Sequence, residues 1–225
     1  PGTWEAARAA ADAAITAADL VSAGRPAAYA CCRPPGHHVT RSAYGGSCYL
    51  NNAAVAAQRL RGHGADRVAI VDVDAHHGNG AQEIFWQRAD VFTGSVHVDP
   101  STGWFPHFLG TAAERGEGEG RGANLNVPAP PGAGDGEWLR AVAEVAQAAR
   151  NNGAEALVLA LGVDAAGGDP ESPLAVSRSG YREAGRIVGA HRLPTVVVQE
   201  GGYDLAAIGD LVLAALEGLE EGLHA

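Results

Sequence analysis

The most reactive stretch of the chain follows an apolar, β-branched run at residues 68–73. Asp72, Asp74, His76 and His77 fall within six positions there. Alternate residues of a strand share a face, so Asp72, Asp74 and His76 point the same way if the extended backbone continues. Carboxylates and imidazoles converging at a strand end are natural ligands for a divalent metal, zinc first. The alternative is a buried Asp–His pair that only stabilises a loop. Burying these groups without a cation is costly, which favours the metal.

Three further strand ends are expected to carry polar side chains. They are His37-His38, Asp164 and the run Glu200-Gly-Gly-Tyr203. A parallel sheet would bring all of them to one edge. Two carboxylates and one imidazole make three metal ligands and leave a position open for water or a substrate carbonyl, as in a catalytic site. A histidine pair that moves protons and a tyrosine hydroxyl near an oxyanion then predict hydrolysis of an amide or a related carbonyl compound.

Hydrophobic periodicity and the positions of Gly and Pro predict strands that alternate with helices. Residues 98–134 are expected to form one long loop rich in Gly and Pro. The alternation predicts a three-layer α/β/α fold with a mainly parallel sheet, as one domain over residues 1–225. Helices are expected at 3–23, 49–60, 80–88, 136–151, 177–191 and from about 204 onward, and strands at 27–32, 68–73, 91–97, 156–161 and 195–199.

Composition limits the class of protein. A hydrophobic content of 46% with 19% charged residues is ordinary for a globular chain of 225 residues. The net charge of −10 argues against a nucleic-acid surface. No apolar run is long enough for a membrane span and no signal peptide is visible, so we expect a cytoplasmic protein without a membrane partner. A homo-oligomer is compatible with the sequence.

The cysteines and the chain start carry two smaller expectations. Cys31, Cys32 and Cys48 are odd in number and lack C-x-x-C spacing, so they are expected to be reduced core thiols. The chain begins at Pro1, contains no methionine and enters a helix almost at once. It therefore has the look of a fragment whose natural start lies upstream.

Five motifs, in order over residues 33–203, resemble those of one known family. They are Arg-Pro-Pro-Gly-His-His38, Cys-Tyr-Leu-Asn-Asn52, Asp-Val-Asp-Ala-His-His-Gly-Asn-Gly80, Gly-Val-Asp164 and Glu-Gly-Gly-Tyr203. The set is similar to the zinc-dependent histone deacetylases and acetylpolyamine amidohydrolases, which share an arginase-like α/β fold. The sequences Gly-Val-Asp164 and Asn-Leu-Asn-Val-Pro128 resemble the bacterial acetylpolyamine branch more than the eukaryotic histone enzymes.

The resemblance implies a role for each matching residue. Asp74, His76 and Asp164 would be zinc ligands. His38 would be the main general base and acid, assisted by His37, with Asp72 orienting His37 and Asn79 orienting His38. Tyr203 would polarise the acyl carbonyl of a small-molecule or peptide substrate. A potassium ion is also implied, surrounded by Asp72, Asp74, His76, Ser95 and Val96.

The acyl channel departs from the family pattern at one wall. Family members usually place an aromatic residue between the Gly and the Cys of residues 46–48, where this chain has Ser47. Phe105 is then expected to form the opposite wall, and the tunnel should be wider or more polar on the Ser47 side. Gly46, Gly162 and Gly202 complete the expected substrate-binding set. The N-terminal segment that family members usually carry before the first helix is also missing, which would leave a sheet edge unpaired.

Two other functions remain open. A two-metal ureohydrolase of the arginase type shares this kind of sheet but needs further bridging carboxylates. After Asp164 the chain offers only Ala-Ala-Gly-Gly before Asp169, and Gly78 follows the His76-His77 pair. An inactive protein that binds acylated amines is the other alternative. The presence of the ligands, the histidine pair and Tyr203 makes it less favoured than a deacetylase.

Overall fold

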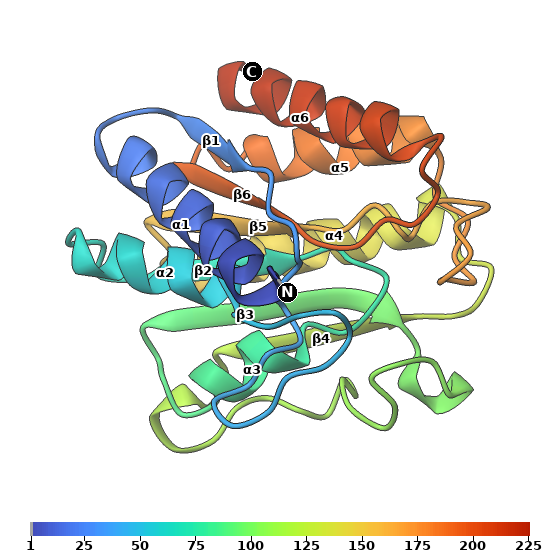
Figure 1. The fold of residues 1–225 in the computed structure, drawn as a ribbon, viewed down its shortest axis with the longest axis horizontal. Coiled ribbons are helices and arrows are strands. Elements are labelled where there is room, and N and C mark those ends of the chain that lie inside the picture. Colours follow the sequence, from blue (N-terminus) through green and yellow to red (C-terminus); the bar gives the residue numbers. More distant parts are fainter. Residues whose placement is uncertain (1) are drawn as a thin grey trace.

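The sheet at the centre of the molecule is wholly parallel. The computed structural model describes residues 2–225, so Pro1, which the predicted domain includes, lies outside the described part. The strand order is β1-β6-β5-β2-β3-β4, and each pairing is parallel. This confirms the predicted class of fold (Figure 1). The strands are β1 (Ala27–Ala30), β2 (Val68–Asp72), β3 (Val91–Val98), β4 (Asn124–Ala129), β5 (Ala156–Leu161) and β6 (Thr195–Gln199).

The central strands are apolar because both faces of the sheet are covered. Along β2, Val71 packs into the core on one face and Ile70 into the core on the other. All five residues of β2 are buried, as expected for a parallel strand with helices on both sides.

Helices complete a three-layer α/β/α arrangement (Figure 1). Three helices pack on one face of the sheet, mainly through alanine side chains that allow close approach. The opposite face is covered by three helices that contribute larger side chains, among them Trp138 and Tyr181, to the core. The first group is α1 (Thr3–Ser22), α2 (Asn52–Gly62) and α3 (Asn79–Phe85), and the second is α4 (Asp135–Asn151), α5 (Arg178–Gly189) and α6 (Ile208–His224).

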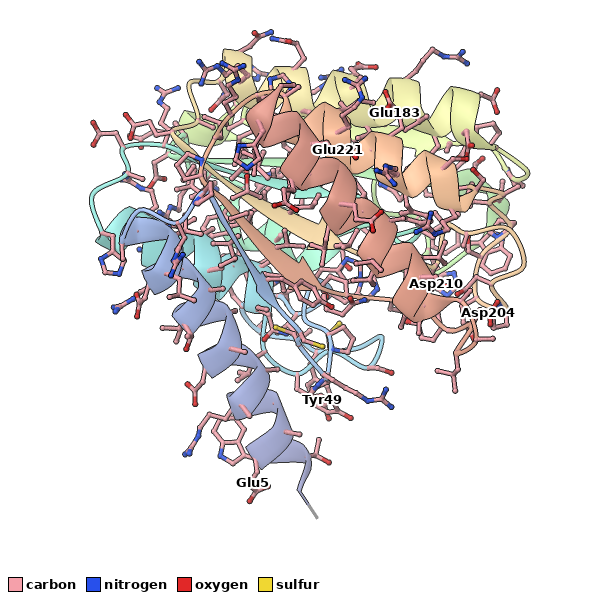
Figure 2. The ribbon with its side chains drawn as sticks, turned by 90° about the horizontal axis from the view of Figure 1, so that it is seen from above. Glu5, Tyr49, Glu183, Asp204, Asp210 and Glu221 are labelled. Atoms are coloured by element: carbon pink, nitrogen blue, oxygen red, sulfur yellow. The ribbon has the colours of Figure 1, made fainter. Side chains whose placement is uncertain are left out.

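The outermost pair of helices, α5 and α6, is joined by ion pairs on its solvent side. Arg182 of α5 lies 3.0 Å from Glu217 and also pairs with Glu221, both on α6. Figure 2 shows Glu221 and Glu183 on these neighbouring helices, with Asp210 further along α6. Exposed pairs of this kind add little stability each.

One strand lies inside the region predicted as a loop. β4 (Asn124–Ala129) pairs with β3, so the prediction of a structureless segment over 98–134 was wrong. The strand contains Pro128, which lacks a backbone donor. β4 is the last strand of the sheet, and an edge position tolerates this missing donor.

The remaining differences are small. α2 begins at Asn52 rather than 49 because the Asn51 side chain caps it by accepting the backbone N–H of Ala54. α6 begins at Ile208 rather than near 204. Cys31 is exposed, although Cys32 and Cys48 are buried and all three are free thiols, so the expectation of three core cysteines was wrong for Cys31.

Among residues 2–225, no helix combines the length and the apolar character that crossing a lipid bilayer requires.

Candidate metal and catalytic site

Four neighbouring strands end at the same edge of the sheet, and the polar motifs follow those ends. β1, β6, β5 and β2 are consecutive in the sheet. The residues after them carry the His37-His38 pair, Tyr203, Asp164 and Asp74 respectively. The carboxyl edge of a parallel sheet is where ligands bind in folds of this kind.

Asp74, His76 and Asp164 form a compact group. One ligand atom from each lies within 4.8 Å of the others. His76 Nδ1 is 3.1 Å from Asp74 Oδ1 and 3.0 Å from Asp164 Oδ2. All three residues are buried. The structure thus brings together the three residues that the sequence suggested as metal ligands.

Backbone groups hold the two carboxylates in place. Asp74 Oδ2 accepts the N–H of Gly201 at 2.7 Å, and Asp164 Oδ1 accepts the N–H of Ala75 at 2.8 Å. A side chain cannot be accommodated at either glycine beside them. A Cβ on Gly201 would lie 2.6 Å from Asp74 Oδ2, and one on Gly162 would lie 2.6 Å from the Asp74 Cα. Asp74 approaches both backbone positions so closely that only glycine fits at 162 and 201.

The two buried carboxylates in this group need a positive charge beside them. Burial and the neighbouring Asp74 raise the pKa of Asp164 to about 7. Burial opposes a charge on His76, but its hydrogen bonds to Asp164 and Asp74 raise the pKa of His76 to about 11. The imidazolium proton thus supplies the positive charge that two buried acids need. Two carboxylates and an imidazole are also a donor set that suits Zn²⁺.

Each histidine of the pair has its own orienting partner. His37 Nδ1 donates to Asp72 Oδ2 at 2.9 Å, and His38 Nδ1 lies 2.7 Å from Asn79 Oδ1. The two ring centroids are 4.0 Å apart. The four residues are therefore arranged as two imidazole–acceptor pairs, one with a carboxylate and one with an amide.

The two imidazoles differ in pKa because burial and nearby charges act on them differently. Burial disfavours a charge on His37, but the carboxylates of Asp74 and Asp72 raise its pKa to about 10. Burial and the charged His37 lower the pKa of His38 to about 3. At neutral pH His37 is a cation and His38 is a neutral base.

Two of the substrate-binding residues suggested by the sequence, Gly46 and Phe105, lie beside this pair. The Phe105 ring is 4.7 Å from the His38 ring and perpendicular to it. A Cβ on Gly46 would lie 2.9 Å from Phe105 Cε1 and 3.1 Å from His38 Nε2. Gly46, Phe105 and His38 therefore meet at one point.

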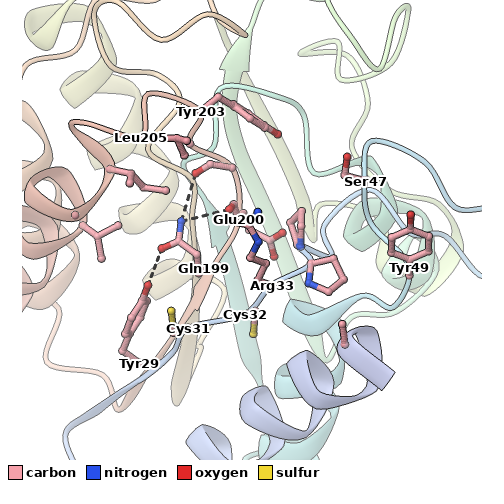
Figure 3. Close-up of a pocket in the computed structure, with 18 of the residues that line it drawn as sticks. Tyr29, Cys31, Cys32, Arg33, Ser47, Tyr49, Gln199, Glu200, Tyr203 and Leu205 are labelled. Atoms are coloured by element: carbon pink, nitrogen blue, oxygen red, sulfur yellow. Dashed lines mark hydrogen bonds between the residues drawn. The ribbon is translucent and has the colours of Figure 1, made fainter. Parts of the chain in front are cut away.

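Ser47 and Gly202 face a separate space. They line a cavity of about 800 Å³ together with Tyr203, whose side chain is 40% exposed. Figure 3 shows Tyr203 and Ser47 at one end of this cavity and Tyr29 at the other. Tyr203 is held by its backbone N–H, which donates to Asp169 Oδ2 at 2.8 Å. Ser47, Gly202 and Tyr203 thus share the lining of one cavity, and a wider or more polar acyl tunnel stays a prediction.

Two functional positions were missed in the sequence. Glu200 is buried, and its Oε2 accepts the N–H groups of Gly36 at 2.7 Å and His37 at 3.0 Å, so it fixes the backbone of the histidine pair. Its place directly after an apolar strand was the available signal. Glu114 accepts the backbone N–H groups of Gly110 and Thr111, and no sequence pattern marked it.

The Glu114 contacts belong to a network that anchors the loop of Phe105. His97 Nε2 donates to the carbonyl of Gly110 at 2.9 Å, and Gln82 Nε2 donates to Glu114 Oε2 at 2.5 Å. This ties the segment after β3 to the strand itself and to α3. The wall of the channel is therefore positioned by the buried His97 and the partly buried Gln82 and Glu114.

Comparisons with known proteins agree with this geometry. Residues 1–219 match the model of the histone deacetylase domain. The chain is 48% identical over 219 residues to the acetylpolyamine amidohydrolase of Mycoplana ramosa, covering 97% of this chain and 64% of that protein. It is 50% identical over 206 residues to the acetylpolyamine amidohydrolase of Burkholderia pseudomallei, covering 92% and 60%.

A solved structure gives the same result. The crystal structure of acetylpolyamine aminohydrolase from Burkholderia pseudomallei superposes with a TM-score of 0.95 at 46% identity, over 99% of this chain and 64% of that one. The chain thus spans less than two thirds of the length of these relatives. A family model that matches nearly the whole chain settles the family: the chain belongs to the histone deacetylase domain family.

Proposed function

We propose that the chain is the catalytic part of a zinc-dependent amidohydrolase that removes an acetyl or similar acyl group from an N-acylated amine. The observation that carries the proposal is the buried group of Asp74, His76 and Asp164 next to the paired histidines. Asp74, His76 and Asp164 would hold the zinc. When bound there, Zn²⁺ supplies Lewis acidity for a carbonyl oxygen and lowers the pKa of water.

His38 is the base in this proposal because of its tautomer. Asn79 Oδ1 can only accept, so the proton of the neutral His38 ring sits on Nδ1. The amide nitrogen of Asn79 lies 3.5 Å from the carbonyl of His38, which supports this orientation of the side chain. The Nε2 lone pair of His38 is then free toward Gly46 and Phe105, where an acyl group would enter.

In this proposal His38 moves the proton, and His37 and Tyr203 stabilise the negative charge on the carbonyl oxygen. Water adds to the acyl carbon, His38 takes its proton, the C–N bond breaks, and His38 returns the proton to the amine nitrogen. The cationic His37, held by Asp72, lowers the energy of the negative charge on the carbonyl oxygen. Burial and the carboxylates of Asp74 and Asp164 raise the pKa of Tyr203, so its hydroxyl stays protonated and donates to that oxygen.

The substrate and the second ion are further parts of the proposal. Acetylpolyamine is the substrate class in the names of several relatives, and an acetylated lysine has the same acylated-amine chemistry. A structural K⁺ would lie near Asp72, Asp74, His76, Ser95 and Val96. Its support is the pairing of β2 with β3, in which Asp72 and Ser95 are register partners.

The ureohydrolase alternative finds no support at its key residue. Asp169 accepts the backbone N–H groups of Glu171, Tyr203 and Asp204. Its carboxylate is engaged in a loop rather than bridging metals. Asp169 also lies outside both groups of clustered ligands found within residues 2–225.

The test is hydrolysis of N-acetylputrescine and of a fluorogenic acetyl-lysine peptide by this protein. We expect turnover with zinc, loss on chelation and recovery on adding zinc. His38→Ala should abolish turnover and keep one bound zinc. His63→Ala, at the exposed end of α2, should keep both the turnover and the bound zinc. Turnover that survives complete zinc removal, or zinc lost from His38→Ala, would contradict the proposal.

A further inference from the structure

A second cluster of side chains with donor atoms for a metal includes His37, one member of the histidine pair. His37, Cys48 and Glu200 each offer a donor atom within 4.8 Å of the others. Their exposed fractions are 3%, 1% and 5%. None of the three belongs to the group of Asp74, His76 and Asp164, called the Asp74 group below. An imidazole, a thiol and a carboxylate in such proximity are unusual in a protein interior unless something binds them.

Each of these groups has an atom that its other contacts leave free. His37 Nδ1 is used by Asp72, and Nε2 is 3.8 Å from Asp74 Oδ1, too far for a hydrogen bond. Glu200 Oε2 is used by two backbone N–H groups, whereas Oε1 is buried without a hydrogen-bond partner. The Cys48 thiol makes one weak contact, 3.4 Å to the carbonyl of Gly46.

The orphaned Oε1 of Glu200 is the feature that points to a ligand. A buried carboxylate oxygen without a partner costs free energy, and such atoms are rare in folded proteins. Burial and the adjacent Glu200 raise the pKa of the Cys48 thiol. Burial also raises the pKa of Glu200 to about 7, against the effect of His37. A divalent cation would compensate both acids at once.

The cluster is accessible without passing the Asp74 group. Glu200 lines the cavity of about 800 Å³, and so does Ser47, the chain neighbour of Cys48 (Figure 3). Arg33 and Gln199 surround Glu200 in the same lining. An ion can therefore approach Glu200 from the cavity.

We propose that His37, Cys48 and Glu200 form a second, inhibitory site for a transition metal. Nitrogen, sulfur and oxygen donors of this kind suit tetrahedral Zn²⁺ or Co²⁺, with the fourth position open. Binding displaces two protons to solvent, that of the Cys48 thiol and that of His37 Nε2, and the metal takes their places. The effect on hydrolysis rests on the function proposed above: Asp72 occupies Nδ1, so a metal on Nε2 leaves His37 no N–H for the substrate oxygen, and excess zinc inhibits.

The decisive test is optical and needs no turnover. The Asp74 group contains no sulfur, so its Co²⁺ gives only weak visible bands. A thiolate-to-Co²⁺ charge-transfer band in the near ultraviolet can arise only from a cysteine ligand. We expect this band to grow with a second equivalent of Co²⁺ added to the metal-depleted protein, after the first visible bands are complete. Its absence would overturn the proposal.

Matched serine variants assign the band to one cysteine. Cys48→Ser should remove it, whereas Cys31→Ser and Cys32→Ser should keep it. Glu200→Gln should weaken the second Co²⁺ by about tenfold or more. The visible bands of the first Co²⁺ show that each variant is folded around its primary site. A band that persists in Cys48→Ser would overturn the assignment.

A zinc titration of activity links the site to catalysis. Zn²⁺ beyond one equivalent should inhibit the wild type, and Cys48→Ser should need about tenfold more zinc for the same fractional inhibition. An inactive protein that shows the band would overturn the proposed function and leave the metal site. An active protein without the band would overturn the second metal site and leave the proposed function standing.

Discussion

The backbone N–H of Gly201 donates to Oδ2 of Asp74 at 2.7 Å. This single bond connects the loop after β6 to the carboxylate that follows β2, and β5 lies between these strands in the sheet. Tyr203 is two residues further along the same loop. The position of the tyrosine is therefore coupled to the position of the metal ligand.

Gly201→Ala should disturb the metal group directly. The added Cβ would lie 2.6 Å from Asp74 Oδ2, so the carboxylate or the loop must move. We expect zinc affinity to fall by about 10–100-fold, measured by competition with a chelator. Gly209→Ala is the control, because a Cβ there meets no atom within 4 Å and the position is helical. Equal zinc affinity in the two variants would contradict this coupling.

Tyr203→Phe tests the oxyanion role. The phenyl ring keeps the size of the side chain and removes only the hydroxyl donor. Turnover should fall by about 10²-fold or more while zinc stays bound. Tyr44→Phe is a matched control, because Tyr44 is 75% exposed and its ring stacks on Tyr49. An unchanged rate in Tyr203→Phe would remove the hydroxyl from the mechanism.

Glu114→Ala should loosen the channel wall. Its carboxylate holds the backbone of Gly110 and Thr111 and the side chain of Gln82. Without it, amide hydrogen exchange across residues 103–111 should accelerate, and KM should rise more than kcat falls because Phe105 is no longer held in place. Glu117→Ala is the control, since Glu117 makes only a 3.3 Å side-chain bond to Gln87. Exchange rates equal in both variants would sink the idea.

Trp138→Ala should be the most destabilising of the tryptophan substitutions. Trp138 is fully buried, and its ring lies 5.1 Å from that of Tyr181. The loss of this packing should lower the free energy of unfolding by about 3–5 kcal/mol in urea titrations. Trp4→Ala, at a ring that is 62% exposed, should cost far less. Similar losses for the two would mean that the core is not organised as described.

Acid should remove the contribution that the Asp90 carboxylate makes to the free energy of unfolding. Hydrogen bonds from Arg88 and Arg61 hold the pKa of this carboxyl below its usual range, although burial opposes them. A folded-state pKa that is depressed stabilises the fold above the unfolded pKa of about 4, and this contribution is lost as pH falls below it.

The comparison with Asp90→Asn makes that loss measurable. The variant should have a lower urea midpoint than the wild type at pH 7, and the gap should shrink as the pH falls toward 2.5. Asp210→Asn, at an exposed position of α6 (Figure 2), is the control. A gap that stays constant with pH would show that Asp90 does not stabilise through its charge.

Much of the site was predictable because its residues are local in sequence. Asp74 and His76 are separated by one residue directly after an apolar run, so the sequence places them together at the end of a strand, although β2 itself ends at Asp72 and the chain bends through both residues. The apolar cores of β2, β5 and β6 were also visible, because strands buried on both faces consist of apolar residues. One domain over 1–225, a homo-oligomer and a cytoplasmic location stay predictions.

Only the tertiary structure decided how these pieces face one another. The order β1-β6-β5-β2 places Glu200 beside His37 and Cys48, which are more than 150 residues away along the chain. Strand order depends on helical crossovers and on packing over the whole sheet, which local periodicity does not report. The same holds for β4, whose proline-containing sequence is a strand only because it lies at the edge of the sheet.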